Sequence, residues 1–218
     1  MPPPTLKRKH FYFLEKYHTL LAVRTLPAFA RLGVTPNQVT VANLLNGLAI
    51  MALVLRGQWL PAAALVQLYL FLDVLDGNLA RYRDMSSRLG AVLDNFGDRF
   101  FYNGVAVAVG WAVGNSWAWI LFFLLAHNLH AAAATFVVVP AIRKNPGFRR
   151  FPFKQALMDR GLIFGMDLSS QDLIATLLLP TPWRIYVVPA CAGLYFADTL
   201  FRLAELALNQ MRPRNPQN

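Results

Sequence analysis

Long apolar stretches separated by short polar segments make up most of the chain. A helix that crosses about 30 Å of hydrocarbon needs roughly 20 mainly apolar residues. Six stretches meet or approach this length, at residues 38–55, 59–80, 90–113, 117–139, 165–181 and 185–208. The fifth stretch begins with several polar residues, so it could instead form a shortened or re-entrant segment. The pattern predicts an all-α membrane protein with six transmembrane helices.

Composition agrees with this pattern. Hydrophobic residues make up 56% of the 218 residues and charged residues 15%, whereas a soluble domain has about 45–50% and about 25%. We find no cleavable signal peptide, internal repeat or soluble linker, and the single Cys191 allows no intramolecular disulfide. We therefore expect one membrane domain over 1–218, with an entry segment at 1–34, a six-helix bundle at 35–208 and a basic tail at 209–218.

The net charge of +10 is distributed unevenly along the chain. Most Lys and Arg residues precede the first stretch, follow the sixth, or lie between the second and third or the fourth and fifth. Because positive residues concentrate on the cytoplasmic side of membrane proteins, both termini and these two loops are predicted to be cytoplasmic. The same distribution disfavours binding to nucleic acid.

Residues 5–24 mix aromatic and leucine side chains with Lys and His. Such a mixture favours an amphipathic helix lying in the membrane interface, with its basic groups against anionic headgroups. A poorly ordered basic tail is the alternative. Further along, Thr35 is a suitable cap and Pro36 a suitable first residue for the helix that follows.

Four aspartates stand where the second and third apolar stretches approach the cytoplasm. Asp73 and Asp76 share one helix face by spacing, and so do Asp94 and Asp98. Because a short loop joins the two helices, these faces can oppose each other. Four converging carboxylates repel one another unless a cation lies among them.

The candidate cation is a hard divalent ion. Oxygen-only ligands without nearby Cys or His favour Mg²⁺ or Mn²⁺, or else Ca²⁺. Two such ions can bind a diphosphate and stabilise both the attacking and the leaving oxygen. In the alternative interpretation, the acids form structural ion pairs with Arg81, Arg88 and Arg99.

Small residues near the aspartates favour the cation site over the ion pairs. Gly77 and Gly90 lie on the two facing helices, where a ligand or backbone can approach closely. Ala80 is also small, and the neighbouring Arg81 is suited to a bidentate phosphate contact.

Together these residues resemble the complete motif of the CDP-alcohol phosphotransferases, also called CDP-alcohol phosphatidyltransferases. The matching positions are Asp73-x2-Asp76-Gly77-x2-Ala80-Arg81-x8-Gly90-x3-Asp94-x3-Asp98. Thr35, Pro36 and Asn37, the six stretches and the interfacial helix are also similar to that family, and the resemblance weakens after about residue 140. It implies a homodimeric enzyme of a bacterial or archaeal cell membrane, with its active site facing the cytoplasm.

The resemblance also implies roles for individual residues. Asp73, Asp76 and Asp94 would bind two divalent metal ions, and Asp98 would be the general base and also a metal ligand. The pocket for the cytidine diphosphate would be lined by Gly77, Ala80, Arg81 and Gly90, with Asn37 and Thr40 also touching the nucleotide. No Ser, Cys or His is placed for a covalent intermediate.

The implied reaction transfers a phosphatidyl group from CDP-diacylglycerol to the hydroxyl of a small polar alcohol, releasing CMP, in phospholipid synthesis. One alternative within the family transfers a CDP-linked headgroup to diacylglycerol, which longer members with more spans usually do. A cation transporter that uses the aspartates is an alternative of another class, although it predicts acids along the whole membrane path.

The acceptor is the least determined part of the reaction. The motif is most similar to enzymes that use inositol phosphate, but these carry an arginine-rich turn before the fifth span. The turn at 168–172 has no arginine here. We therefore expect a small polyol or hydroxyl acceptor, approaching from the cytoplasm. Its identity stays open between inositol phosphate, glycerol phosphate, serine and other alcohols, and the missing arginines disfavour inositol phosphate. Arg143, Lys144 and Arg160 could bind an acceptor phosphate, or they could contact anionic lipid.

His127 and His130 lie three residues apart within the fourth stretch. They could bind a metal or substrate, but no acid stands beside them in the sequence. Packing or hydrogen bonding between helices is the favoured interpretation.

Overall fold

The computed structural model describes residues 10–86, 88–145 and 147–211, and every long element in that part of the chain is a helix. The helices are α1 (Phe13–Arg31), α2 (Pro36–Leu55), α3 (Trp59–Tyr82), α4 (Arg88–Ala112), α5 (Trp117–Ala133), α6 (Val139–Lys144), α7 (Pro152–Asp159), α8 (Leu168–Leu178) and α9 (Val187–Met211). A π-helical segment, Ala134–Val138, joins α5 to α6, and a 3-10 segment, Pro182–Tyr186, leads into α9. The predicted all-α class is confirmed.

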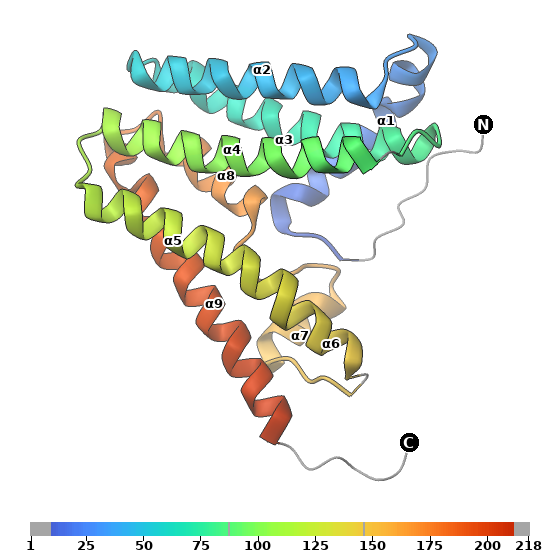
Figure 1. The fold of residues 1–218 in the computed structure, drawn as a ribbon, viewed down its shortest axis with the longest axis vertical. Coiled ribbons are helices and arrows are strands. Elements are labelled where there is room, and N and C mark those ends of the chain that lie inside the picture. The colour runs from blue at the N-terminus through green and yellow to red at the C-terminus, as the bar shows by residue number, and fades with distance from the viewer. Residues whose placement is uncertain (1–9, 87, 146, 212–218) are drawn as a thin grey trace.

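The bundle has two parts that meet at an angle (Figure 1). In one part α2, α3 and α4 run beside one another, and in the other α5 packs along α9. The short helix α8 contacts both α3 and α9, so it connects the two parts. α1 packs on α3. This arrangement brings the end of α3 and the beginnings of α2 and α4 together, which is where the motif lies.

The start of α2 is determined by local chemistry. The Thr35 hydroxyl accepts a hydrogen bond from the Gln38 backbone N–H at 3.4 Å, and the Gln38 side chain accepts one from the Thr35 N–H at 2.8 Å. This reciprocal capping box satisfies donors that a helix leaves free, and Pro36 supplies the fixed φ of the first turn. The predicted cap is confirmed. Arg83 then ties the end of α3 to the start of α2 through the Val34 carbonyl at 2.7 Å.

Four helices within the described residues are long and apolar enough to cross a membrane. They are Pro36–Leu55, Trp59–Tyr82, Trp117–Lys144 and Pro182–Gln210. These correspond to the first, second, fourth and sixth predicted spans. The six-span count is therefore confirmed only as far as these four.

The other two predicted spans differ from a simple transmembrane helix. α8 has 11 residues, or about 16 Å at 1.5 Å per residue, so it is too short to cross by itself. The short α8 agrees with the expectation that the fifth apolar stretch forms a shortened segment. α4 has 25 residues, but Asp94, Asp98 and Arg99 interrupt its apolar character. Its N-terminal half therefore supplies polar groups to the pocket between the helices.

Helix α1 lies farther along the chain than the predicted interfacial helix at 5–24. Its buried face, with Ala22 and Leu26, packs with Val39, Leu75 and Leu79 from α2 and α3. The basic residues of the first nine positions lie outside the described part of the chain, and so do those after residue 211.

The main core lies between α2, α3, α4, α5 and α9. Its largest fully buried side chains include aromatic rings from α3, α4, α5 and α9, namely Tyr69, Phe101, Tyr102, Phe123 and Tyr195. Several of these rings carry hydroxyls that must find partners when buried. Polar contacts therefore run through the core beside the motif.

Candidate active site

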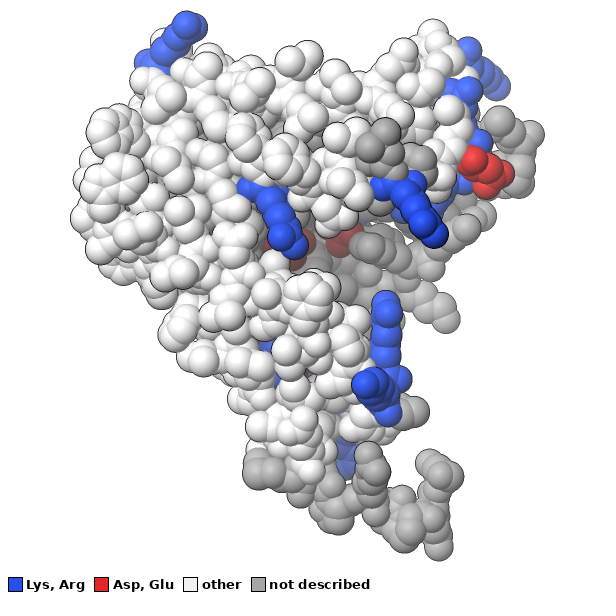
Figure 2. Space-filling model, in the orientation of Figure 1, with Lys and Arg blue, Asp and Glu red and all other residues white. Residues whose placement is uncertain are grey.

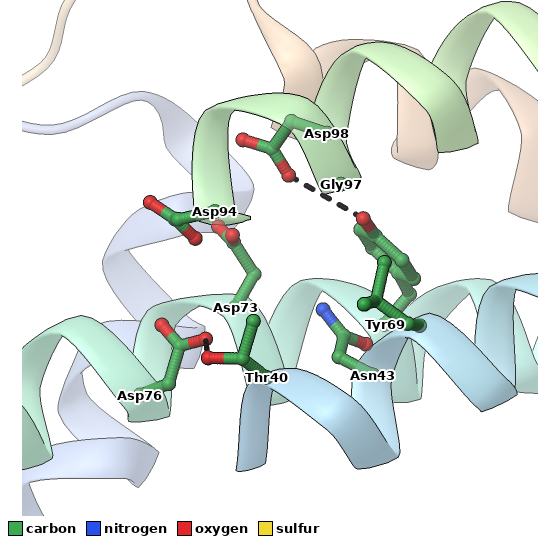
Figure 3. A pocket seen from close by; sticks show the side chains of 9 residues that line it. Thr40, Asn43, Tyr69, Asp73, Asp76, Asp94, Gly97 and Asp98 are labelled. Carbon is green, nitrogen blue, oxygen red and sulfur yellow. Dashed lines mark hydrogen bonds between the residues drawn. The ribbon is translucent and has the colours of Figure 1, made fainter. Parts of the chain in front are cut away.

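Helices α2, α3 and α4 together form the pocket that contains the motif aspartates (Figure 3). We call it the aspartate pocket. It is lined by Thr40, Asn43, Leu44, Tyr69, Asp73, Asp76, Asp94, Gly97 and Asp98. All four predicted aspartates therefore meet, two from α3 and two from α4. The spacing along each helix predicted the shared faces, and the packing of both α3 and α4 against α2 makes those faces converge.

Three of the four carboxylates are arranged closely enough to bind one ion. Asp73, Asp76 and Asp94 each offer an oxygen atom, and these atoms lie within 4.8 Å of one another. Oxygen donors at this separation suit Mg²⁺, Mn²⁺ or Ca²⁺, which prefer carboxylate ligands. The residues therefore fit a hard divalent cation. Asp98 lines the same pocket and is not part of this closest group.

Thr40 orients one of these carboxylates. Its hydroxyl donates a hydrogen bond to Asp76 Oδ2 at 2.8 Å. The same hydroxyl lies 3.2 Å from the Pro36 carbonyl one helical turn earlier. Asp76 is itself 6% exposed, so this contact holds a buried carboxylate in place. The sequence predicted Thr40 as a nucleotide contact, and the structure adds its bond to Asp76.

Asn43 is a lining residue that the sequence analysis did not identify. It lies one turn after Thr40 on α2 and is 5% exposed. Its Oδ1 is buried and has no hydrogen-bond partner, which costs about 1–3 kcal/mol for a buried polar atom. A ligand in the pocket would relieve this cost, so Asn43 supports a binding role for the pocket. The helical spacing from Thr40 could have pointed to it.

Gly97 permits the close approach of α4 to α2 beside Asp98. A Cβ at this position would lie 3.0 Å from Leu44 Cδ2, tighter than most real contacts. A side chain at this position would require Leu44 to shift beside the pocket. Gly97 was also missed, because its role depends on which helix packs against it.

The Arg81 side chain folds back over Gly77. A Cβ at Gly77 would lie 3.6 Å from both Nη1 and Nη2 of Arg81, so the small residue leaves room for the guanidinium. Arg81 also interacts electrostatically with Asp76 and Asp94. Its position next to the carboxylates agrees with the predicted phosphate contact, which stays a prediction.

The other predicted nucleotide residues lie near the pocket in the chain but are not among its lining residues. Asn37 is exposed in the first turn of α2, while Ala80 and Gly90 are half-buried near the end of α3 and the start of α4. Their proposed contacts with the nucleotide stay predictions.

The predicted acceptor residues belong to a different part of the surface. Arg143 and Lys144 end α6, Arg160 follows α7, and all three are exposed. Figure 2 shows acidic side chains inside a hollow between the α4 layer and the α5–α6 part, with Lys or Arg side chains on its rim. A basic rim around an acidic hollow suits an anionic substrate that binds together with cations.

The two histidines take part in contacts between helices. His127 Nδ1 lies 3.3 Å from Asn103 Oδ1 of α4, and His130 Nδ1 lies 3.0 Å from the Thr199 hydroxyl of α9. These contacts agree with the favoured interpretation of helix-to-helix hydrogen bonding.

The comparison with known families decides the classification. The CDP-alcohol phosphatidyltransferase family model matches residues 33–197, more than half of the chain. The chain belongs to this family. The match includes α2, α3 and α4 and therefore every residue of the aspartate pocket.

The relatives with similar sequences include an IPC transferase and several phosphatidylinositol phosphate synthases. A bifunctional IPC transferase and DIPP synthase of Thermococcus kodakarensis is 32% identical over 165 residues, 70% of this chain and 38% of the relative. A phosphatidylinositol phosphate synthase of Streptomyces avermitilis is 38% identical over 92 residues, 39% of this chain and 37% of the relative. The chain thus spans less than half the length of these curated relatives.

Solved structures share the fold. The crystal structure of Mycobacterium tuberculosis phosphatidylinositol phosphate synthase with CDP-DAG bound has a TM-score of 0.53 and 19% identity, covering 89% of this chain and 92% of that chain. The structure of that enzyme with manganese and citrate has a TM-score of 0.54, covering 91% and 93%. With four candidate spans and this family, the chain is an integral membrane protein.

Proposed function

We propose that this protein transfers a phosphatidyl group from a CDP-alcohol to the hydroxyl of a small polar acceptor and releases CMP. The proposed CDP-alcohol is CDP-diacylglycerol. The observation that carries the proposal is the approach of three carboxylate oxygens within 4.8 Å at the motif of the family. The names of the neighbouring structures, with CDP-DAG in one and manganese in another, support the donor and the metal.

Each motif residue has a defined task in this reaction. Asp98 accepts the proton of the acceptor hydroxyl, whose oxygen then forms a bond to the β-phosphorus of the donor. The bond from that phosphorus to the oxygen bridging it to CMP breaks, and CMP leaves with the bridging oxygen. Arg81 donates to the phosphate oxygens, while Gly77, Ala80 and Gly90 leave room for the nucleotide.

Asp73, Asp76 and Asp94, with Asp98 beside them, are the residues that would hold two divalent ions, Mg²⁺ or Mn²⁺. When bound, these ions supply charge neutralisation for the diphosphate and the leaving group. Thr40 keeps Asp76 oriented toward the other carboxylates through its 2.8 Å hydrogen bond. Asn37, on the exposed first turn of α2, is assigned to the nucleotide.

The test is CMP release by the purified full chain in detergent, with CDP-diacylglycerol and a mixture of small polyols. We expect release with Mn²⁺ or Mg²⁺ and none after chelation by EDTA. Asp73→Asn should abolish release, whereas Asp159→Asn, which changes an exposed acid on α7, should not. Metal-independent release would contradict the proposal. If CMP is released only from a CDP-linked headgroup in the presence of diacylglycerol, the alternative reaction is favoured. If cations cross the membrane and no CMP is released, a transporter is favoured.

We also propose that the acceptor is a polyol or hydroxyl compound other than inositol phosphate. The start of α8, where the related branch carries arginines, is capped here by Asp167. Its carboxylate accepts from the Ser170 N–H at 2.9 Å and from the Ser169 hydroxyl at 2.8 Å. A carboxylate in this place occupies the helix N-terminus and repels a phosphate.

An acceptor screen measuring CMP release tests this point, with inositol phosphate included because of the relatives' names. Strong activity with inositol phosphate alone would contradict the proposal. If the acceptor carries a phosphate, Arg143→Ala, Lys144→Ala and Arg160→Ala should each raise its KM by a few fold, about 1 kcal/mol for an exposed pair. The KM for the donor should stay unchanged.

The proposed enzyme is a homodimer of a bacterial or archaeal cell membrane with six spans, an interfacial helix α1 and a cytoplasmic active site. Support for the contact of α1 with the membrane interface comes from an exposed apolar stripe formed by Phe13, Tyr17 and Leu21.

A cysteine introduced at the exposed Ser86, in the loop between α3 and α4, tests on which side of the membrane the active site lies. The native Cys191 is buried and should react slowly. Labelling of Ser86→Cys only from outside the cell would contradict this topology.

A further inference from the structure

Tyr69 contacts the candidate base from the interior of the bundle. It lies on α3, one helical turn before Asp73, and is 2% exposed. Its hydroxyl donates a hydrogen bond to Asp98 Oδ1 at 3.4 Å, as the dashed line in Figure 3 shows. Bonds of catalytic groups are often this long before substrate binds.

The ring of Tyr69 is held by three helices. It stacks on Phe101 of α4 with 3.5 Å between ring centroids and 12° between planes, and Tyr102 meets it edge-on at 5.8 Å. Gly47 of α2 makes room for the stack, because a Cβ there would lie 2.9 Å from Phe101 Cδ2 and 3.4 Å from Tyr69 Cε2. The position of the hydroxyl is therefore determined by tightly packed rings.

The contact matters because Asp98 has other carboxylates as neighbours. The side chain of Asp98 shares the pocket with Asp73, Asp76 and Asp94, whose charges repel it when all are ionised. A buried hydroxyl that donates to one oxygen of Asp98 limits rotation of the carboxylate. This leaves the second oxygen available to the pocket that Asp98 lines.

We propose that Tyr69 is a positioning residue for Asp98: its hydroxyl holds Oδ1, so that Oδ2 is directed at the acceptor hydroxyl. This inference rests on the proposed function, in which Asp98 takes the acceptor proton. The proton passes to Asp98 and not to Tyr69, which keeps its own proton throughout. Tyr69 acts through Asp98 and need not touch the substrate.

Tyr69→Phe in the full chain removes the hydroxyl and keeps the ring stack. We expect kcat for CMP release to fall roughly 10–100-fold, part of the contribution of a positioned base. The KM values for donor and acceptor should stay within about twofold, since a lost transition-state contact lowers kcat without changing ground-state binding. Binding of Mn²⁺ alone, followed by electron paramagnetic resonance, should also be unchanged.

Tyr102→Phe is the matched control. Tyr102 is 1% exposed and belongs to the same group of rings, but its hydroxyl donates to Asp172 Oδ2 of α8 at 2.8 Å. Loss of a buried hydroxyl at this position affects stability without touching Asp98. We expect its kcat to remain close to that of the wild type, even where its Tm falls.

Gly47→Ala provides a second variant if Tyr69→Phe does not fold. The added methyl must displace the stack and should lower kcat with KM unchanged. A wild-type kcat in Tyr69→Phe, or equal losses in Tyr69→Phe and Tyr102→Phe, would overturn the assignment while leaving the proposed function intact. If Tyr69→Phe cannot be purified, a wild-type kcat in Gly47→Ala overturns it. Absence of CMP release by the wild type overturns both.

Discussion

The aspartate pocket and the region around α9 both bury acidic side chains, but only the second brings matching cations with it. We call the second group the α9 ion cluster; it comprises Lys154, Asp198, Arg202 and Glu205. Lys154 Nζ lies 3.8 Å from Asp198 Oδ1 and 3.5 Å from Glu205 Oε2. Arg202 Nε donates to Asp198 Oδ2 at 2.8 Å. Two positive charges thus balance two negative ones.

The α9 ion cluster also fastens loop backbone to the bundle. Glu205 accepts from the Phe151 N–H at 2.8 Å, and Asp198 accepts from the Met166 N–H at 3.1 Å. These bonds join both ends of the segment around α7 to α9. Asp198 Oδ1 has no hydrogen-bond partner, but Lys154 Nζ lies 3.8 Å from it. Because its charges are balanced within the cluster, the group acts as a structural connection.

The aspartate pocket has the opposite balance. Four carboxylates converge there, while Arg81 is the described cation that interacts with two of them. Excess negative charge in a bundle interior is costly, and divalent ions relieve it. The balance of local charge, more than the presence of buried acids, therefore separates a binding site from a structural one.

The largest effect is expected for loss of one pocket carboxylate. Asp76→Ala should reduce CMP release by about 10³-fold or more, because residues that act as one unit are not independent. The variant should insert normally, and its metal-free Tm should equal or exceed that of the wild type, since repulsion is removed. The CMP-release assay checks the loss of activity, and thermal melting in detergent checks the Tm. Turnover near that of the wild type would contradict a binding role for the aspartate pocket.

The next effect concerns the α9 ion cluster. Lys154→Met leaves Glu205 buried without its cation and should lower the free energy of unfolding by about 3–5 kcal/mol, as removal of one buried partner does. The double variant Lys154→Met/Glu205→Gln should regain part of this loss, because it removes the unpaired charge. Melting curves of the wild type, the single variant and the double variant measure these changes in the free energy of unfolding. A loss below about 1 kcal/mol would mean that the cluster behaves like an exposed pair.

Metal addition provides a third contrast. Mn²⁺ at about 100 times its dissociation constant should stabilise the protein by about 2.7 kcal/mol, because it binds only the folded pocket. The shift in Tm should disappear in Asp94→Asn and persist in Glu205→Gln. A shift that survives in Asp94→Asn would assign the ion to another site.

The smallest effect is expected for Thr40→Val, which keeps the shape of the side chain and removes its hydroxyl. Loss of the hydrogen bond to Asp76 should cost about 1.5 kcal/mol, as for bonds to charged groups. Mn²⁺ affinity should fall about tenfold, by the same conversion. Thr25→Val, which changes a hydroxyl of α1 bonded to backbone carbonyls, is the control and should leave Mn²⁺ affinity unchanged.

Much of the candidate site could be predicted because its pattern is local. The spacing of Asp73 and Asp76, and of Asp94 and Asp98, places each pair on one face of its own helix whatever the helix packs against. The capping box at Thr35 depends only on residues three apart. The apolar stretches that form the four candidate spans follow in the same way from length and composition.

Other features required the tertiary structure. Tyr69 and Gly97 have roles that depend on which ring or helix faces them. Lys154, which stands between the fourth and fifth apolar stretches, is 2% exposed. The α9 ion cluster joins residues about 50 positions apart, which no periodicity reveals. Helical spacing is a property of neighbouring residues, so the sequence by itself determines which side chains share a face. Which faces then meet is decided by packing between distant helices, because the interior stabilises only combinations that fill space and balance charge.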